Sequence, residues 1–471
     1  MSVTALMVRH VTYRLWAWRD GRSSLFQCMA ELRRQPTEAD LQAGQRRRLE
    51  AMLRHAYGTV PFYRTWFDRA GLRPSEFGEP SALQKLPLLS KEIIRENLSQ
   101  LCSTRYRPHQ LYPDSTGGST GLPLRFFRDR ECIVRRKAQE LFFDQWMGYR
   151  LGDRTALFVA PVHMPQTLDG WKARIRNATA ERLLAFDPYA ISDAYLGDFA
   201  ARYNSYKPHL VRCFPNSLVI FAEFLRRRGI TPWRPRAVSC TGENLYPDQR
   251  ALFAEVFQCP VFEKYGTFEC GVIACECRAH QGMHVFVDGA VVEILMDGRP
   301  ASPGQVGRIV VTDLYNHGMP LIRYDIGDLA SWGSGPCACG SPLPRLERVW
   351  GRDRDILVAQ DGSPRPGYVL VEMVRKLNLS SQFQIIQEAP DRLHVRYAPV
   401  RELPGGALDA VSAAFRSQLG EGVQIHFERV PEIPRAPSGK FVYVQSLISP
   451  YRRSGAGPSQ QTLQAFQGQV T

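Results

Sequence analysis

The stretch Ser115–Pro123, which reads STGGSTGLP, places four hydroxyl side chains and three glycines within nine residues. Such a run can form a flexible linker, or a turn whose exposed amides and hydroxyls surround a phosphate. No Lys-Ser or Lys-Thr pair follows the glycines at Walker spacing, so the sequence does not predict a P-loop. On its own, the stretch leaves the linker and the phosphate-binding loop open.

Four other segments carry residues that could act on an anionic ligand. Glu269, in EKYGTFECG (263–271), could hold Mg²⁺ or cap a helix, and Asp328, in PLIRYDIGDLA (320–330), could bind the paired hydroxyls of a ribose or form a turn. GRDRDIL contributes Arg352, and PRAPSGKFVYVQS places Lys440 between a turn and an apolar strand. A lone lysine is usually a solvated surface charge. These residues therefore indicate a ligand site only if they are considered together.

Cysteine and histidine residues gather in two short segments. CECRAHQGMH and CACG together contain Cys275, Cys277, His280, His284, Cys337 and Cys339. A Cys-x-Cys-Gly turn is typical of a zinc knuckle, and three cysteines with one histidine form a common structural zinc set. The alternative is that these are free buried thiols.

Composition narrows the class of protein. The 471 residues exceed one compact core, and 44% hydrophobic with 23% charged residues is ordinary for a soluble globular enzyme. The net charge of +14 suits anionic ligands or simple solubility, and no nucleic-acid-binding pattern is present. Without a membrane-spanning run or a convincing secretory signal, we expect a cytoplasmic protein with reduced thiols. The N-terminal stretch mixes arginine with aromatic residues, so it predicts an amphipathic helix that packs on the protein or lies on a membrane surface.

Hydrophobic periodicity predicts an α/β protein: helix-layered β-sheets in a large N-terminal domain, followed by a small α+β C-terminal domain. Residues 1–110 read as its helical first part and 111–350 as a core in which strands alternate with helices, with antiparallel hairpins after 284. Residues 351–448 form the small domain, and 449–471 are a polar, Gly/Ser/Gln-rich tail that we expect to be flexible.

The order of the segments resembles the adenylate-forming superfamily, and more narrowly its phenylacetate–CoA ligase-like branch, which includes polysaccharide-cluster adenylyltransferase-like proteins. The resemblance runs from about Leu49 to Gln445. It implies an acyl-CoA synthetase-like fold with a mobile C-terminal lid, and AMP-forming activation of a carboxylic acid by ATP. It also implies a nucleotide site made of the following residues: Ser115, Thr116, Gly117, Gly118, Ser119, Thr120 and Gly121 at the phosphates, Gly242 and Glu243 at adenine, Tyr265, Gly266 and Thr267 beside them, and Asp328 at the ribose.

The same resemblance assigns catalytic and metal-binding roles. Glu269 faces Mg²⁺, Arg352 is the hinge arginine, and Lys440 is the catalytic lysine of the mobile domain. Because branch members resemble this sequence at four of the six Cys/His positions, we expect the ligands of a structural Zn²⁺ to be Cys277, His284, Cys337 and Cys339.

One departure from the branch leaves the acyl acceptor open. Branch members usually read Gly-Arg-x-Asp-Asp at the hinge, whereas here Arg354 replaces the first acid and leaves Asp355, and DGSPRPGYV replaces the loop that follows. This loop belongs to the face used in the second half-reaction, so adenylation is better supported than transfer to CoA. CoA is still the expected acceptor, but an amine, a hydroxyl, a carrier-protein thiol or a non-catalytic binding role stays open. The acid is expected between the helix after 215 and the segment 240–270, near Phe214, Asn216, Phe262 and Phe268, and the oligomeric state is open.

Overall fold

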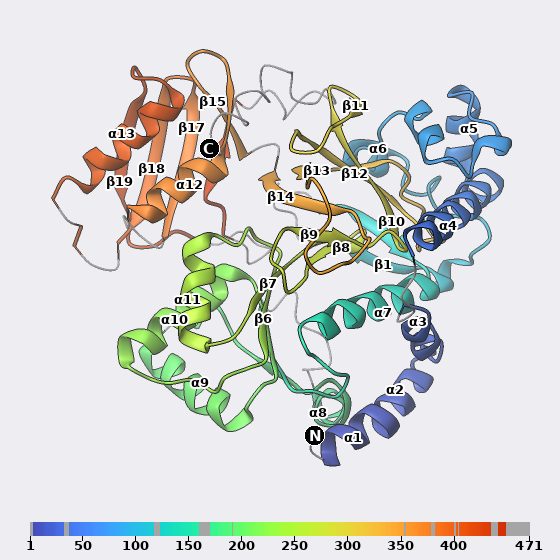
Figure 1. Ribbon diagram of the computed structural model, residues 1–471, viewed down its shortest axis with the longest axis horizontal. Helices are drawn as coiled ribbons and strands as arrows, with labels where there is room; N and C mark the ends of the chain where they lie inside the picture. The colour runs from blue at the N-terminus through green and yellow to red at the C-terminus, as the bar shows by residue number, and fades with distance from the viewer. Residues whose placement is uncertain are drawn as a thin grey trace.

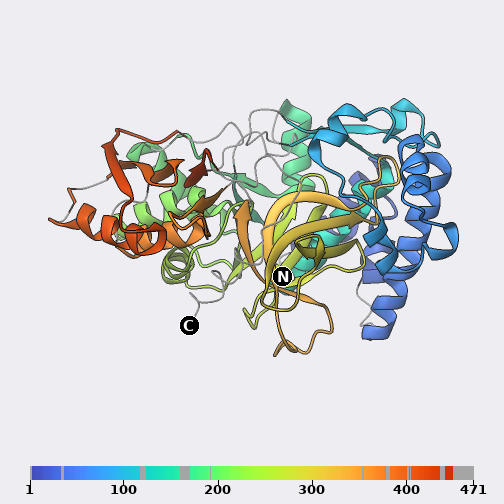
Figure 2. The same ribbon diagram turned by 90° about the horizontal axis from the view of Figure 1, so that it is seen from above.

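A computed structural model of the chain describes residues 3–32, 37–116, 123–159, 170–190, 192–352, 355–377, 382–399, 402–403, 405–434 and 441–448. The N-terminal helices lie at one end of the molecule and the C-terminal unit lies at the other, with a large sheet between them (Figures 1 and 2).

The first part of the chain is helical. Its α-helices are α1 (Val3–Met7), α2 (Tyr13–Arg19), α3 (Leu25–Leu32), α4 (Glu38–Thr59), α5 (Pro61–Arg69) and α6 (Lys91–Glu96), with a π-helical turn η1 (Val8–Thr12) between α1 and α2. Three short 3₁₀ turns follow: η2 (Pro74–Glu76), η3 (Pro80–Lys85) and η4 (Pro108–Gln110). A capping box between Thr37 and Asp40 begins α4, and the α4 pattern ends just before Pro61, which takes the first position of α5.

A twelve-stranded sheet forms the centre, in the order β11-β10-β12-β13-β14-β9-β8-β7-β6-β5-β3-β4. Strands β3 (Thr155–Phe158), β4 (Leu183–Ala185), β5 (Leu210–Cys213), β6 (Ala237–Thr241) and β7 (Val261–Thr267) are parallel. The antiparallel strands are β8 (Gly271–Glu276), β9 (Met283–Val285), β10 (Ala290–Met296), β11 (Arg299–Pro300), β12 (Val306–Asp313), β13 (Tyr324–Trp332) and β14 (Arg345–Arg352). A separate hairpin joins β1 (Tyr112–Ser115) to β2 (Arg125–Arg128).

Helices between the parallel strands cover this half of the sheet. They are α7 (Arg130–Trp146), α8 (Gly170–Arg176) with the π-turn η7 (Asn177–Glu181), α9 (Asp193–Tyr206), α10 (Pro215–Arg228) and α11 (Pro247–Phe257). Helix α10 ends where Gly229 takes a left-handed conformation with φ of 64°. A buried core rich in phenylalanine joins α9, α10 and α11 to the strands.

The C-terminal part has its own sheet and core. Its sheet has the order β19-β18-β17-β20, formed by β17 (Gln382–Ala389), β18 (Arg392–Ala398), β19 (Gln424–Arg429) and β20 (Val444–Ser446), with helices α12 (Gly367–Lys376) and α13 (Ala407–Leu419). The hairpin of β15 (Ile356–Val358) and β16 (Pro364–Pro366) precedes it. The predicted class, α/β with helix-layered sheets and a small α+β unit, is confirmed.

The topology decides where a ligand can bind. Parallel strands β5, β6 and β7 end side by side, and the chain turns at the carboxyl end of each one. Open α/β sheets bind ligands outside the carboxyl ends of such strands. Phe214, Gly242 and Phe268 follow these three strands, so the candidate site lies at this edge.

Candidate active site

The smaller of two cavities brings several predicted residues together. Its volume is about 170 Å³, and it lies between the large sheet and the C-terminal unit. Its lining includes Gly242, Glu243, Tyr265, Gly266, Asp328 and Arg352, which come from four separate segments of the sequence. Residues up to 110 positions apart in the chain therefore face one space, as a nucleotide site requires.

Asp328 is the centre of the polar network in this cavity. It pairs with Arg352 in the register of β13 and β14, and Arg352 Nε lies 2.9 Å from Asp328 Oδ1. The Tyr265 hydroxyl donates to Asp328 Oδ2 at 2.7 Å. The negative charge of Asp328 raises the pKa of Arg352 well above its ordinary value, against the opposite effect of burial. Arg352 therefore supplies a permanent cation at the cavity.

Two glycines allow the backbone to approach this space. Gly242 has a φ of 79°, and a Cβ there would lie 2.6 Å from the ring of Phe214. A Cβ on Gly266 would collide with the backbone oxygen of Gly271 on the adjacent strand. Both turns therefore require glycine for a steric reason.

Glu269 lies in the tight turn between β7 and β8. It is buried, and its carboxylate accepts a hydrogen bond of 2.8 Å from the Tyr324 hydroxyl. Its charge also contributes to the raised pKa of Arg352, so the two groups are within electrostatic reach. A buried carboxylate at this place has the oxygen chemistry that Mg²⁺ prefers.

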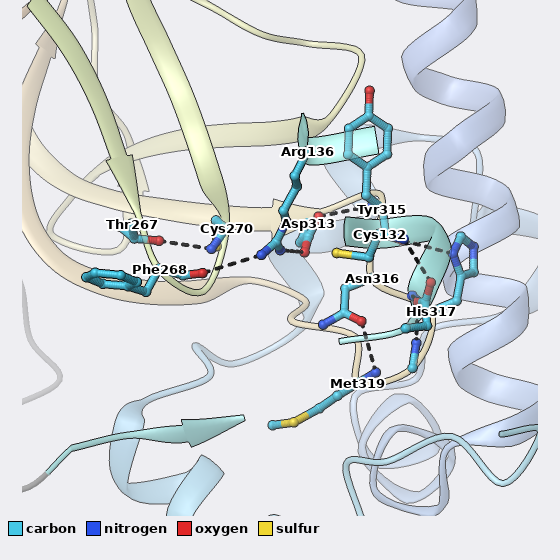
Figure 3. Close-up of polar contacts among 12 residues, drawn as sticks. Cys132, Arg136, Thr267, Phe268, Cys270, Asp313, Tyr315, Asn316, His317 and Met319 are labelled. Atoms are coloured by element: carbon cyan, nitrogen blue, oxygen red, sulfur yellow. Dashed lines mark hydrogen bonds and ion pairs between the residues drawn. The ribbon is translucent and has the colours of Figure 1, made fainter. Parts of the chain in front are cut away.

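Arg136 on α7 holds the turn that carries Glu269. Its guanidinium forms an ion pair with Asp313 and donates to the carbonyl of Phe268 at 3.4 Å (Figure 3). The Thr267 hydroxyl accepts from the Cys270 amide at 3.0 Å inside the same turn. The Thr267 hydroxyl is therefore engaged in a hydrogen bond inside the turn. The contacts of Arg136 hold the same turn and so fix the position of Glu269.

Of the hydroxyl-rich stretch 115–123, the structure describes Ser115, Thr116 and Pro123. Ser115 ends β1, and Thr116 exchanges two hydrogen bonds with Leu124 across the base of the loop, of 3.0 and 2.9 Å. The other predicted phosphate ligands lie outside the described residues: Gly117, Gly118, Ser119, Thr120 and Gly121.

Hydrogen bonds join the C-terminal unit to residues that line the smaller cavity. The amide of Phe441 donates to Glu243 Oε1 at 2.8 Å, and the Tyr443 hydroxyl donates to Asn216 Oδ1 at 2.6 Å. Asn216 also holds Glu243 Oε2 through its own amide groups, at 3.1 and 2.9 Å. Lys440 lies outside the described residues, but its neighbour Phe441 is in the wall of the cavity.

A second contact holds the two parts together further out. Arg375 of α12 forms an ion pair of 2.7 Å with Asp248 of α11, and its Nη1 donates to the Tyr443 hydroxyl at 2.9 Å. The rings of Tyr246 and Tyr368 stack with centroids 4.9 Å apart. The arrangement therefore closes the C-terminal unit over the smaller cavity.

The larger cavity lies next to the smaller one, with a volume of about 340 Å³. Lys264 of β7 lies in the walls of both cavities. Phe214 and Phe268 line the larger cavity, as expected for an acid site, whereas Asn216 lines the smaller one and Phe262 packs in a buried core. The N-terminal helices contribute Tyr13 to the far wall.

Buried and partly buried ion pairs form one side of the larger cavity. Lys137 lies 3.0 Å from Glu140, Glu140 lies 2.9 Å from Arg212, and Lys264 lies 3.0 Å from Asp144, which also binds Arg212. Burial lowers the pKa of Lys137, but Glu140, Tyr13 and Glu181 together outweigh it and the net shift is upward.

Two buried polar atoms at this cavity have no protein partner among the described residues: Ser239 Oγ and Arg212 Nε. A buried polar group without a partner is costly, and a ligand that bonds to it removes that cost.

Sequence reasoning missed Arg136, Asp313 and Tyr443, which position the site, and it assigned Asn216 to the acid site and not to the contact with Tyr443. Arg136 and Asp313 are 177 positions apart, and Asn216 and Tyr443 are 227 apart. No local motif marks these four residues, because each acts through a partner that only the fold supplies.

A Cys/His cluster lies away from both cavities. Donor atoms of Cys277, His284, Cys337 and Cys339 all lie within 4.8 Å of one another. Cys339 Sγ is 3.3 Å from His284 Nε2, Cys277 Sγ is 3.6 Å from Cys337 Sγ, and His284 Nδ1 lies 3.2 Å from the carbonyl of Leu343. That contact lets Nδ1 donate its proton and leaves Nε2 free for a metal, so the set fits a tetrahedral ion. Cys275 and His280, the two remaining candidates, bond elsewhere, to the Glu276 backbone and side chain.

Comparison with solved structures defines the class of the fold. The crystal structure of 2-hydroxyisobutyryl-CoA ligase in the postadenylation state matches with a TM-score of 0.69 and 20% identity, over 90% of this chain and 91% of that chain. Anthranilate CoA ligase AuaEII in complex with anthranoyl-AMP matches with a TM-score of 0.52 and 15% identity, over 72% and 66% of the two chains. The chain thus has the fold of the adenylate-forming ligases.

Sequence comparison finds relatives that match most of the chain. Phenylacetate-coenzyme A ligase of Thermus thermophilus is 24% identical over 76% of this chain and 80% of its own length. Protein CapK of Staphylococcus aureus is 21% identical over 76% and 79%, and residues 358–446 match the CapK C-terminal domain. The chain is thus similar to phenylacetate-coenzyme A ligase and to CapK, which confirms the resemblance stated from the motifs.

Proposed function

We propose that this protein activates a carboxylic acid with ATP, forms an acyl-adenylate and releases pyrophosphate. One observation carries the proposal: a cavity lined by Asp328, Arg352 and Gly242 shares Lys264 with a second, larger cavity. ATP would occupy the smaller cavity and the acid the larger one. Their reacting ends would then meet at the shared wall.

The chemistry requires two anions to be aligned. An oxygen of the carboxylate attacks the α-phosphorus of ATP, the bond to the bridging oxygen breaks, and pyrophosphate leaves. Arg352 and Lys440 would offset the charge that develops on the phosphates, and Asp328 would bind the ribose hydroxyls. Mg²⁺ bound at Glu269 would screen the phosphate charge.

In a second step we propose that the C-terminal unit, residues 351–448, moves and admits CoA. The thiol attacks the acyl carbon, a thioester forms and AMP leaves. The latch formed by Glu243, Asn216 and Tyr443 would have to open for this movement, because it joins the two parts across the cavity.

The lining of the larger cavity suggests the chemistry of the acid. Leu141, Leu157 and Val272 supply apolar wall, whereas Ser239 and Arg212 present the unpartnered polar atoms. We propose an acid with an apolar body and at least one hydrogen-bonding substituent.

Pyrophosphate release over a panel of carboxylic acids tests the proposal. We expect ATP- and Mg²⁺-dependent release with one class of acid, and near-complete loss in Lys440→Ala with ATP binding kept. Lys376→Ala is a matched control, since Lys376 is an exposed lysine of the same unit. Release that persists in Lys440→Ala would remove that lysine from the mechanism.

The acceptor is tested separately by supplying CoA, amines or a carrier protein to the adenylate. We expect a CoA thioester. If the acyl group is transferred only to an amine, a hydroxyl or a carrier thiol, the proposed adenylation stands but CoA is not the acceptor. If no acid gives pyrophosphate release, the protein is a non-catalytic homologue.

For the Cys/His cluster we propose a structural Zn²⁺ that joins β8 and β9 to the loop before β14. All four positions would be filled by protein, which leaves no place for a substrate. We expect one equivalent of zinc by elemental analysis and a lower melting temperature in Cys339→Ser. Cys259→Ser, at a buried cysteine outside the cluster, should keep the zinc.

A further inference from the structure

The N-terminal helices have one buried face and one apolar face that no described residue covers. Residues 3–19 run as α1, η1 and α2, and Ala5, Val8, Tyr13 and Ala17 are buried against the protein. The opposite face exposes Met7, Val11, Leu15 and Trp18, at helical spacing, and Trp18 is 74% exposed. About half of the hydrophobic residues of this helix are therefore not explained by packing against the protein.

A second helix with the same character lies beside it. Helix α8 and the π-turn η7 after it lie next to the N-terminal helices (Figure 1). Trp16 Nε1 donates to Thr179 Oγ1 at 3.1 Å, and Arg176, the last residue of α8, lies 2.8 Å from Asp20. Helix α8 exposes Trp171 and Ile175, one turn apart. Seven of the twelve large exposed hydrophobic side chains in the described part of the chain lie on these two neighbouring helices.

The exposed charges around these side chains have one sign. The exposed charged residues of 3–19 and 170–181 are Arg14, Arg19, Lys172 and Arg174. The acids of the described residues near these helices are Asp20 and Glu181, and Arg176 forms an ion pair with each of them. The surface made by the outer faces of the two helices, here called the N-terminal patch, thus combines bulky apolar side chains with a basic rim.

We propose that the N-terminal patch binds the surface of a membrane that contains anionic lipids. Apolar side chains, tryptophan above all, enter the boundary between headgroups and acyl chains, and arginine and lysine pair with lipid phosphates. The described residues contain no helix with the length and apolar composition needed to cross a bilayer, so the contact is a surface contact.

The charge pattern favours a membrane over a second copy of this chain. A symmetric dimer through the patch would place the same arginines and lysines of both copies in one interface, and the described residues of 3–19 and 170–181 offer no exposed acid to meet them. An anionic bilayer instead supplies the opposite charge over the whole patch. The net charge of +14 acts in the same direction.

Sedimentation of the full chain with vesicles tests the proposal. One vesicle is phosphatidylcholine alone, and the other contains about one third phosphatidylglycerol. We expect binding to the anionic vesicle at least about tenfold stronger than to the neutral one, and weaker at high salt. The double variant Leu15→Glu/Trp18→Glu, and separately Trp171→Glu, should each reduce binding about tenfold or more.

Matched controls separate patch chemistry from folding. Leu447→Glu changes an exposed leucine at the other end of the molecule and should bind like the parent. Circular dichroism and the melting temperature identify any patch variant that has lost its fold, in which case Lys172→Glu/Arg174→Glu, exposed on α8, replaces it. No vesicle binding, equal binding to both vesicles, or light scattering that shows a patch-dependent dimer without vesicle binding would each overturn the proposal.

Discussion

The two cavities differ in how the chain builds them. The smaller one is lined by short turns and strand ends, and each key residue belongs to a local pattern of glycine, acid or arginine. The larger one is lined by side chains from α2, α7, η7 and strands β3 to β8, none of which forms a motif. Lys264 is common to both.

This difference has a physical origin. Backbone must approach a nucleotide closely, and close approach depends on local conformation, as at Gly242 and Gly266. A pocket for a small acid instead depends on the volume and polarity left between packed elements, to which distant residues contribute. We therefore expect variants of the smaller cavity to affect the use of ATP, and variants of the larger cavity to affect the use of the acid.

The largest effect is expected from Asp328→Asn, which acts on the smaller cavity. The change removes the charge that faces Arg352 and weakens the bond from Tyr265. We expect kcat/KM for ATP to fall about 100-fold or more, because a buried cation loses its partner and the proposed ribose contact is lost. Pyrophosphate release as a function of ATP measures it.

Asp325→Asn is the control for that variant. Asp325 is on the same strand and its ion pair is with Arg308, away from both cavities. Comparable losses in the two variants would mean that the strand is merely destabilised and that Asp328 has no special contact with ATP.

Lys264→Met tests the shared wall. Asp144 keeps Arg212 as a partner in this variant, so the network loses one cation without leaving an isolated acid. We expect a loss of about 10- to 100-fold in kcat/KM for the acid, together with a higher KM for ATP. Lys137→Met, which removes a cation lining only the larger cavity, should leave the KM for ATP unchanged. If Lys264→Met also left that KM unchanged, the two cavities would not share a functional wall.

More of the smaller cavity than of the larger one could be predicted from the sequence. Six motif residues converge at the smaller one, and the four-ligand Cys/His choice coincides with the cluster in the fold. The α/β class followed from periodicity, since buried strands such as β3 and β5 are short apolar runs.

The larger cavity could not be predicted to the same extent. Tyr13, Arg212 and Ser239 meet only because the N-terminal helices fold back onto η7 and the parallel strands. Phe262 lies on a strand next to the site, yet its side chain points into a core. Single-sequence reasoning has no access to such long-range packing, because it depends on tertiary contacts.

Glu263 allows a pH test at the smaller cavity. Burial, with the charge of Glu276 as a second cause, raises the pKa of Glu263 from an ordinary 4.5 to about 7. Between these values the unfolded chain releases this proton and the folded chain keeps it, so the contribution to stability is full below pH 4.5 and is lost as the pH rises through 7.

Glu263→Gln should therefore change how the stability of the protein, measured by thermal unfolding, depends on pH. The variant should lose less stability between pH 5 and pH 8 than the parent, by about 1–3 kcal/mol in the free energy of unfolding. Glu347→Gln, on β14 and outside both cavities, serves as the control. Parallel curves for parent and Glu263→Gln would show that this carboxyl does not titrate near neutrality.

The smallest effect is expected from Tyr13→Phe, which removes one hydroxyl from the far wall of the larger cavity. If the acid bonds to that hydroxyl, its KM should rise about threefold, the cost of one neutral hydrogen bond, and the KM for ATP should stay the same. Tyr203→Phe removes another buried tyrosine hydroxyl, one that lines neither cavity, and should change neither KM. An effect of Tyr13→Phe on ATP alone would place the substrates the other way round, because Tyr13 reaches only the larger cavity.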